Sequence, residues 1–280
     1  MEDREFFYLK RRIKALMGVD LDNYREPQMR RRLNALVSRT AAPNVVTYCR
    51  MLEQDPRMLE ELRRFLTIKV TEFFRDPLPF DYLAKAVLPN LLAKNHRLRI
   101  WSTGCSTGGE PYSLALLLRD LSPYARHTIL ATDIDEVSLV KARAGGPYRA
   151  SEVKNVPSHL LENYFRVEDG FYRVSDRIRQ TVIFRQHDLL CDAFESEFDI
   201  ILCRNVTIYF TDLARSQLNS RFFKSLKPGG VLFIGATESL NDGGEQGFAR
   251  LAHCFYLRPG PARAESPSGE GLALSVGGRH

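Results

Sequence analysis

The chain has 280 residues, of which 44% are hydrophobic and 26% are charged, and its formal net charge is +6. These values are typical of a globular protein with a sizeable core, which excludes a chain that is disordered throughout. No apolar stretch approaches the ~18 residues that a membrane-spanning helix needs, so we expect no membrane insertion. The first residues, MEDREFFYLKRR, lack the apolar segment of a secretory signal, and we therefore expect a cytoplasmic protein.

The five cysteines, at positions 49, 105, 191, 203 and 254, form no CxxC pair. An odd count without that spacing argues against a disulfide framework and against a zinc site. We therefore expect reduced thiols and no metal.

Residues 1–76 have the spacing of amphipathic helices. Apolar residues recur three or four positions apart, as in Phe6, Leu9 and Ile13, and no part of this region alternates as a strand does. We predict an all-α N-terminal domain. Residues 4–39 hold ten Lys or Arg and four acidic residues, a net charge of +6, so the rest of the chain is neutral. This local charge predicts an acidic partner for the domain.

The prolines of Asp76-Pro77-Leu78-Pro79 interrupt the helical pattern, and we interpret residues 77–97 as a linker. In residues 98–258, short apolar runs alternate with helical stretches. This alternation predicts a parallel sheet covered by helices on both faces, which is a Rossmann-like α/β domain. The predicted strands cover residues 98–101, 128–131, 182–184, 198–203, 231–234 and 254–257, and the predicted helices cover 111–121, 136–144 and 213–226.

Residues 146–181 do not follow that alternation. The stretch FRVEDGFYRV (165–174) has β-prone arms around a Glu-Asp-Gly turn, which indicates a hairpin. We predict a small inserted β subdomain here. The tail, residues 259–280, is rich in Gly, Pro, Ser and Ala, and we expect it to be flexible.

The loop after the first predicted strand, STGCSTGGE (102–110), has three glycines within six residues, which lets a ligand approach the backbone closely. Its GxxxGG spacing lacks the second glycine of the dinucleotide fingerprint and favours a nucleoside without a pyrophosphate. Gly104 is the residue that we expect to lie against it. The alternative is a loop that only packs strand against helix.

Polar residues also follow the second and third strands. In TDID (132–135), we expect Asp133 to bind the hydroxyls of a ribose and Asp135 to cap the next helix. The alternative is that Asp133 is itself part of the cap. After the third strand, a polar group beside Leu189 can reach an adenine amine while the leucine packs near the ring. We interpret the preceding His187 as an ordinary loop residue.

The fourth strand leads into CRNVTIYF (203–210), whose polar residues would point into the same cleft. The Tyr209 ring suits a methyl group or a sulfonium cation, but it could equally begin the core contacts of the next helix. The turn KPGG (227–230) before an apolar strand is typical of nucleoside-dependent methyltransferases. Outside the sheet, Arg75 is either a clamp for a ligand carboxylate or an ion-pair partner of Asp76, and the residues alone favour the ion pair.

Together these motifs resemble the CheR-type chemotaxis receptor methyltransferases. The resemblance covers about residues 5–257, and its motifs occur in the order that the family has. The matching stretches are TEFFRDP (71–77), IWSTGCSTGGEPYSLA (100–115), ATDID (131–135), CRNVTIYF (203–210) and LKPGGVLFIGATE (226–238).

The resemblance assigns roles to individual residues. In the family, the threonine and arginine of TxFFR contact the cofactor, which implies Thr71 and Arg75 and replaces the ion-pair interpretation. Two positions depart from the family pattern: Lys69 stands where an asparagine is usual, and Gly109 where STGEEPYS has its first glutamate. Tyr209 would lie near the reacting methyl, which makes it the second catalytic candidate beside Arg75. The other implied cofactor-binding residues are Glu110, Asp133, Asp188, Leu189, Arg204 and Asn205.

The resemblance implies an enzyme that transfers a methyl group from S-adenosylmethionine to glutamate side chains of chemoreceptors in chemotaxis adaptation, with S-adenosylhomocysteine as product. A glutamate is already ionised near pH 7, so the reaction needs no general base, and we expect no covalent nucleophile.

The basic N-terminal domain suits the acidic cytoplasmic helices of a receptor, and we expect Arg30, Arg31 and Arg32 to contact them. We expect a monomer at receptor arrays that binds no nucleic acid. The alternatives are a carboxyl methyltransferase of the same fold acting on another protein, and a non-catalytic module that responds to S-adenosylmethionine.

Overall fold

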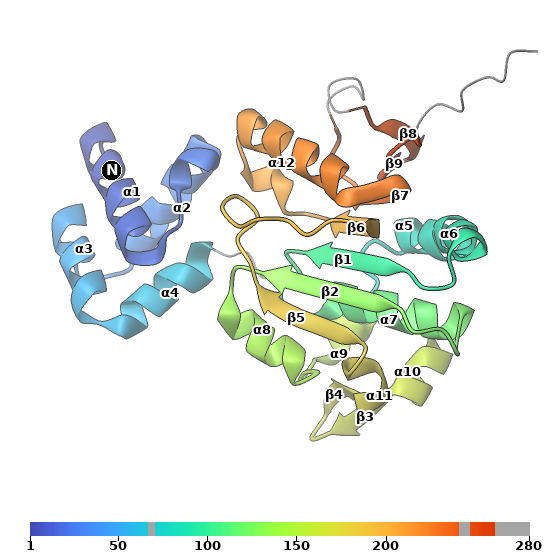
Figure 1. Ribbon diagram of the computed structural model, residues 1–280. Helices are drawn as coiled ribbons and strands as arrows, with labels where there is room; N and C mark the ends of the chain where they lie inside the picture. Colours follow the sequence, from blue (N-terminus) through green and yellow to red (C-terminus); the bar gives the residue numbers. More distant parts are fainter. Residues whose placement is uncertain (67–70, 241–246, 261–280) are drawn as a thin grey trace, which may run out of the picture.

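The computed structural model describes residues 1–66, 71–240 and 247–260, which form a helical part and an α/β part (Figure 1). The helical part confirms the all-α prediction up to Leu66, whereas Phe73 and Phe74, which lie within the predicted bounds of 1–76, are buried in the core of the α/β part. Its core holds the periodic apolar residues, among them Phe6, Leu9, Ile13 and Leu33, all at most 2% exposed. Its elements are α1 (Asp3–Met17), the 3₁₀ turn η1 (Leu21–Asn23), α2 (Glu26–Val37), α3 (Val45–Gln54) and α4 (Pro56–Leu66).

The α/β part is built on one seven-stranded sheet with the order β5-β2-β1-β6-β7-β9-β8. Its strands are β1 (Arg99–Thr103), β2 (Thr128–Asp133), β5 (Val182–Gln186), β6 (Phe198–Cys203), β7 (Leu226–Ile234), β8 (Ala249–Ala252) and β9 (Phe255–Leu257). From β1 the chain moves outward to β2 and β5, and from β6 it moves the other way to β7. The strand order therefore reverses between β1 and β6, which is where such sheets bind ligands.

Side chains alternate across β1 and reach both layers of helices. Trp101 packs against Phe198 and against Phe222 of α12 (Asp212–Ser225) on one face. The next residue, Ser102, donates from its hydroxyl to Glu110 of α7 (Gly109–Leu121) on the other face. Helix α8 (Glu136–Arg143) packs beside β2 and β5. The predicted Rossmann-like architecture is confirmed.

Residues 77–97 are not a linker, which corrects the sequence-based prediction. They form α5 (Pro77–Tyr82), the π-helical turn η2 (Leu83–Val87) and α6 (Leu88–Lys94). Phe80 and Leu83 are buried in the core of the α/β part. Pro77 and Pro79, which suggested a break, instead occupy the first turn of α5, where the missing N–H costs nothing.

The sheet is also mixed rather than wholly parallel. β9 pairs antiparallel with both β7 and β8, and β8 has no counterpart among the predicted strands. The KPGG segment lies within β7, where a register shift between Phe198 and Ile200 of the partner strand accommodates Gly229 at a φ of +80°. Antiparallel strands at one edge are common in such sheets.

The predicted hairpin is present as β3 (Phe165–Glu168) and β4 (Phe171–Val174), an antiparallel pair separate from the main sheet. Three short helices flank it: α9 (Ala150–Val153), α10 (Ser158–Tyr164) and α11 (Asp176–Arg179). The tail prediction concerns residues 259–280, of which 261–280 lie outside the described residues.

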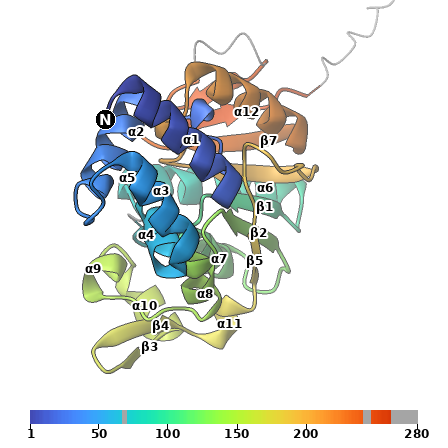
Figure 2. The same ribbon diagram turned by 90° about the vertical axis from the view of Figure 1, so that its left-hand side faces the viewer.

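The helical part lies across the edge of the sheet where β1 and β2 end (Figures 1 and 2). Main-chain bonds join it to the segment after β6: Arg25 N donates to Tyr209 O at 2.9 Å, and Thr211 N donates to Asn23 O at 2.9 Å. The Tyr24 and Phe210 rings meet edge to face with centroids 5.2 Å apart. The carboxyl edge of the sheet is therefore covered by residues from both parts.

Candidate cofactor-binding and active site

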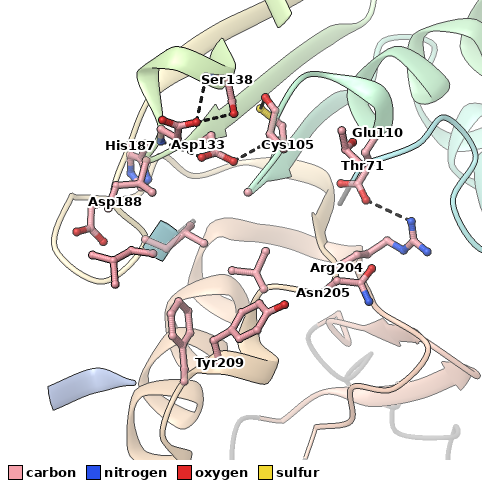
Figure 3. A pocket seen from close by; sticks show the side chains of 18 of the residues that line it. Thr71, Cys105, Glu110, Asp133, Ser138, His187, Asp188, Arg204, Asn205 and Tyr209 are labelled. Carbon is pink, nitrogen blue, oxygen red and sulfur yellow. Dashed lines mark hydrogen bonds and ion pairs between the residues drawn. The ribbon is translucent and has the colours of Figure 1, made fainter. Parts of the chain in front are cut away.

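A pocket lies where β1, β2, β5 and β6 end, and nearly all of the predicted site residues line it (Figure 3). The predicted residues in its wall are Thr71, Arg75, Gly104, Glu110, Asp133, Asp188, Leu189, Arg204, Asn205 and Tyr209. The helical part contributes Tyr24 and Leu66. Segments as distant in sequence as residues 24 and 210 thus enclose one cavity.

The glycines of the first loop are explained by close packing. Gly104 has a φ of +62°, and a Cβ there would lie 2.5 Å from Cγ2 of Val206, so only glycine fits. A Cβ on Gly109 would lie 3.0 Å from Oγ1 of Thr71 and 3.1 Å from the backbone of Glu72. The loop therefore touches the segment after β6 on one side and the TEFFR segment on the other.

The two aspartates after β2 have the separate roles expected for a cap and a ligand-facing acid. Asp135 caps α8, because its carboxylate accepts hydrogen bonds from N and Oγ of Ser138 at 3.1 and 2.5 Å. Asp133 faces the pocket, and its carboxylate accepts from Ser106 N at 2.7 Å and from Asp135 N at 2.9 Å. These bonds orient the group, and a carboxylate, which accepts up to about four hydrogen bonds, is of the type that binds the hydroxyls of a ribose.

A buried ionic cluster connects α7, β6 and the TEFFRD segment. The Arg204 side chain, 2% exposed, lies 3.4 Å from Glu110 and 2.9 Å from Asp76, and it also donates to Arg75 O at 2.8 Å. The aromatic rings of Phe80 and Phe233 lie against its guanidinium. Burial raises the pKa of Glu110, although Arg204 and the hydroxyl of Ser102 act in the opposite direction. Asp76 is thus paired with Arg204 across the fold.

The Asn205 loop, defined as residues 204–211, forms the part of the wall that lies against the glycine loop. Asn205 has a φ of +58°, a left-handed conformation that asparagine tolerates better than most residues. Tyr209 lines the pocket, and burial raises the pKa of its phenol, which therefore stays protonated at neutral pH. The sequence left open whether Tyr209 is a ligand contact or a core residue, and the structure places it in the pocket wall.

The loop after β5 supplies Asp188 and the buried Leu189. Asp188 accepts from Leu190 N at 2.8 Å, and its own N–H donates to Asp192 at 2.8 Å. The His187 ring also lines the pocket and packs edge-on against Trp101. His187 is therefore part of the pocket wall and not only the ordinary loop residue that the sequence predicts.

Several pocket residues were not predicted from the sequence, among them Tyr24, Ser106 and Ser138. Tyr24 comes from the helical part, where no motif marked it. Ser106 lies within the recognised glycine loop and Ser138 three residues after ATDID, but neither side chain carries a local signal that predicts a place in the pocket. Lys69, the departure from the family pattern, lies outside the described residues.

The three consecutive arginines of α2 point in different directions. Arg30 is bound within its own domain by Asp3 and Glu26, each at 2.7 Å. Arg32 donates to the carbonyl of Phe65. Arg31 is exposed. Successive residues of a helix lie ~100° apart, so they cannot form one face.

The pocket has the chemistry that S-adenosylmethionine requires. Asp133 suits a ribose, and Glu110 suits an α-ammonium group. Ser106 Oγ and His187 Nδ1 are buried polar atoms in the pocket wall without a hydrogen-bond partner in the described part of the chain, so a ligand can satisfy them. The glycine loop lets the ligand lie against the backbone. A Rossmann-like domain with this site defines a nucleoside-dependent methyltransferase.

Burial raises the pKa of the Cys105 and Cys203 thiols well above the ordinary value, so both are protonated near neutral pH. Within residues 1–66, 71–240 and 247–260, no group of three or more His, Cys, Asp or Glu side chains is placed to hold a metal ion. The same residues include no helix long and apolar enough to cross a membrane.

Comparisons with known proteins agree with this class. Residues 69–253 match the family model "CheR methyltransferase, SAM binding domain", and residues 4–67 match "CheR methyltransferase, all-alpha domain". The chain belongs to the CheR methyltransferase family, which confirms the resemblance seen in its motifs, and it is an S-adenosylmethionine-dependent methyltransferase.

Three curated relatives show how much of the chain the similarity covers. A chemotaxis protein methyltransferase of Listeria monocytogenes is 35% identical over 257 residues, covering 91% of this chain and 98% of the relative. Chemotaxis protein methyltransferase 2 of Vibrio cholerae is 35% identical, covering 91% of this chain and 87% of the relative. Chemotaxis protein methyltransferase 1 of Pseudomonas aeruginosa is 34% identical, covering 82% of this chain and 88% of the relative.

Proposed function

We propose that the protein transfers the methyl group of S-adenosylmethionine to glutamate side chains of a chemoreceptor, as part of chemotaxis adaptation. The observation that carries the proposal is a single pocket that Asp133, Glu110, Arg75 and Tyr209 all line. The basic helical domain contributes to the same pocket. The family membership and the chemotaxis relatives support it.

The chemistry needs positioning more than proton transfer. Bound S-adenosylmethionine supplies a methyl group on a sulfonium, which a carboxylate oxygen takes in line while the electron pair of the broken bond stays on sulfur. In this proposal Asp133 binds the ribose, and Glu110 binds the α-ammonium group. Arg75 and Tyr209 surround the reacting centre and exclude water. The protonated phenol of Tyr209 presents a neutral ring to the cation, which favours a sulfonium over its face.

The partner proposed for the helical domain is the acidic helical region of a receptor. The net charge of +6 in residues 4–39 favours such a surface. Because Arg30 and Arg32 are already bound within the protein, Arg31 is the arginine of α2 best placed to contact the partner directly.

The deciding experiment measures methyl transfer from labelled S-adenosylmethionine to receptor-containing membranes, with release of methanol by mild alkali as the sign of carboxyl methyl esters. Asp133→Asn should abolish the label and weaken S-adenosylhomocysteine binding about 10- to 100-fold. This factor corresponds to the loss of one hydrogen bond to a charged group. The exposed Asp120→Asn is the matched control and should leave both unchanged.

The outcomes separate the alternatives. Alkali-labile label on another protein, but none on receptors, would mean a carboxyl methyltransferase with a different substrate. Tight binding of S-adenosylhomocysteine without methyl transfer to any receptor would favour the non-catalytic module. Label that survives alkali would reject carboxyl methylation.

The receptor surface has its own test. Arg31→Glu should raise the apparent KM for the receptor and weaken its salt dependence, with kcat retained. Arg50→Glu makes the same charge change on α3, where Arg50 is also exposed. An equal rise in KM for both variants would show a general effect of charge and reject a specific role for Arg31.

A further inference from the structure

Glu238 is a buried acid that ends the motif LKPGGVLFIGATE (226–238) and to which the sequence assigns no role. It lies after β7 and is 9% exposed. One carboxylate oxygen accepts from Asn205 N and from Gly235 N, each at 2.7 Å. The other accepts from Thr207 N at 2.9 Å and from Thr207 Oγ1 at 2.7 Å. All four donors are neutral, and the described residues place no cation against the carboxylate.

These bonds hold the Asn205 loop at its most constrained point. Asn205 has its left-handed φ of +58°, and the hydrogen bond to Glu238 restrains its N–H. The other loop donor, Thr207, lies two residues further along. Between them, Val206 packs so closely against Gly104 that no Cβ fits there. Glu238 therefore holds the Asn205 loop where Val206 packs on the glycine loop.

The packing around the carboxylate shows that its position is specific. A Cβ on Gly235 would lie 2.5 Å from Oε2 of Glu238 and 3.0 Å from both N and Nδ2 of Asn205. The backbone N–H of Glu238 also donates to Gly235 O at 3.0 Å, which closes the turn. Glycine at 235 thus allows the glutamate to reach back to the Asn205 loop.

We propose that Glu238 is a positioning residue for cofactor binding and methyl transfer, acting through Asn205 and Val206 without touching the cofactor. The side chain acts here only as an acceptor, because each of its two oxygens accepts two hydrogen bonds. A glutamine of the same shape must turn its NH₂ group either toward the N–H groups of Asn205 and Gly235 or toward the N–H group of Thr207, and it loses the bonds on that side that come from backbone N–H. In either orientation the Asn205 loop loses a restraint at or near the left-handed Asn205.

The test compares Glu238→Gln with Asp199→Asn, a matched change at the opposite edge of the sheet. Asp199 is also buried, and its carboxylate accepts from Arg99 N at 2.7 Å and from Lys227 at 2.9 Å. Both changes replace a buried carboxylate by an amide, so both should lower the melting temperature. Only Glu238→Gln should raise the Kd of S-adenosylhomocysteine, by about tenfold. It should also lower kcat at saturating S-adenosylmethionine.

A milder variant, Thr207→Val, removes one of the four donors and keeps the backbone. We expect its Kd for S-adenosylhomocysteine to rise about two- to threefold. If Glu238→Gln does not fold, this variant and Asp199→Asn still provide the comparison.

Two results would overturn the proposal. One is a Kd within twofold of the wild-type value for folded Glu238→Gln, or for Thr207→Val where Glu238→Gln does not fold. The other is an equal rise in Kd for Asp199→Asn, which would reveal only general destabilisation. The kcat measurement rests on the proposed function, because it needs methyl transfer to a receptor. The titration of S-adenosylhomocysteine measures binding alone and needs no receptor. A wild-type protein that binds the nucleoside and methylates no receptor would therefore reject the proposed function and leave the role of Glu238 tested.

Discussion

Replacing Arg204 by methionine tests the buried ionic cluster most directly. The change removes the guanidinium and leaves an apolar chain between the rings of Phe80 and Phe233. Asp76 and Glu110 then lose their ion-pair partner. Removing one member of a buried pair costs about 3–5 kcal/mol, because the remaining charge stays buried.

The structure places the expected loss at the lower end of that range. The Asp76 side chain is 39% exposed, so water compensates most of its lost interaction. The Glu110 side chain is only 15% exposed, and it carries most of the penalty. We expect a loss of about 3 kcal/mol, which lowers the melting temperature by about 6–12 °C in a protein of this size. Arg185→Met, which breaks an exposed pair with Glu195, should cost less than about 1 kcal/mol.

The sign of the pH dependence identifies the cause. Burial already raises the pKa of Glu110 in the wild-type protein, and loss of Arg204 raises it further. A carboxyl whose pKa is higher in the folded state than in the unfolded state binds its proton more tightly when folded. The destabilisation is therefore small below the ordinary pKa of glutamate and grows as the pH rises through the raised pKa.

Thermal melts at pH 5.5 and pH 8 measure this difference. Arg204→Met should be more destabilised, relative to wild type, at pH 8. Combining it with Glu110→Gln should restore about 1–2 kcal/mol, because the second change removes the unpaired charge. Strictly additive losses, or a penalty that does not change with pH, would refute the assignment to Glu110.

Two further predictions concern the helical part and α5. Tyr24→Ala removes the ring that packs on Phe210 and lines the pocket, and it should raise the Kd of S-adenosylhomocysteine about three- to tenfold in a calorimetric titration; an unchanged Kd would show that the helical part does not shape the site. Phe80→Ala should cost about 3–5 kcal/mol in urea denaturation because the ring is 2% exposed, whereas Leu78→Ala, at 81% exposure, should cost less than about 0.5 kcal/mol. Similar small losses for both would restore the interpretation of residues 77–97 as a linker.

The elements that the sequence predicted well are those with a local signal. The apolar spacing of Phe6, Leu9 and Ile13 marks the buried stripe of α1, since a helix must bury one face. The alternation of strands and helices predicted the Rossmann-like domain, and the residues after each strand predicted part of the pocket wall. The carboxyl ends of parallel strands meet at one edge, which brings Asp133 and Asn205 together without further information.

The elements that were missed depend on tertiary contacts. The prolines at 77 and 79 suggest a break between elements. The same residues begin a helix here because Phe80 is buried in the core of the α/β part. Strand β8 is largely exposed and has no apolar alternation to mark it. Whether β9 runs parallel or antiparallel to β7 depends on the path of the chain, which apolar content does not encode.

The contacts that shape the pocket most closely are also the least local. Glu238 holds the Asn205 loop from the side of the sheet, across 33 residues of sequence. From the other side, Arg25 N and Asn23 O bind the same loop at Tyr209 and Thr211. Helix α2 begins at Glu26, directly after Arg25. A partner that binds α2 therefore acts one residue away from the hydrogen bond that restrains Tyr209, so residues 23–25 connect the basic domain to the wall of the pocket.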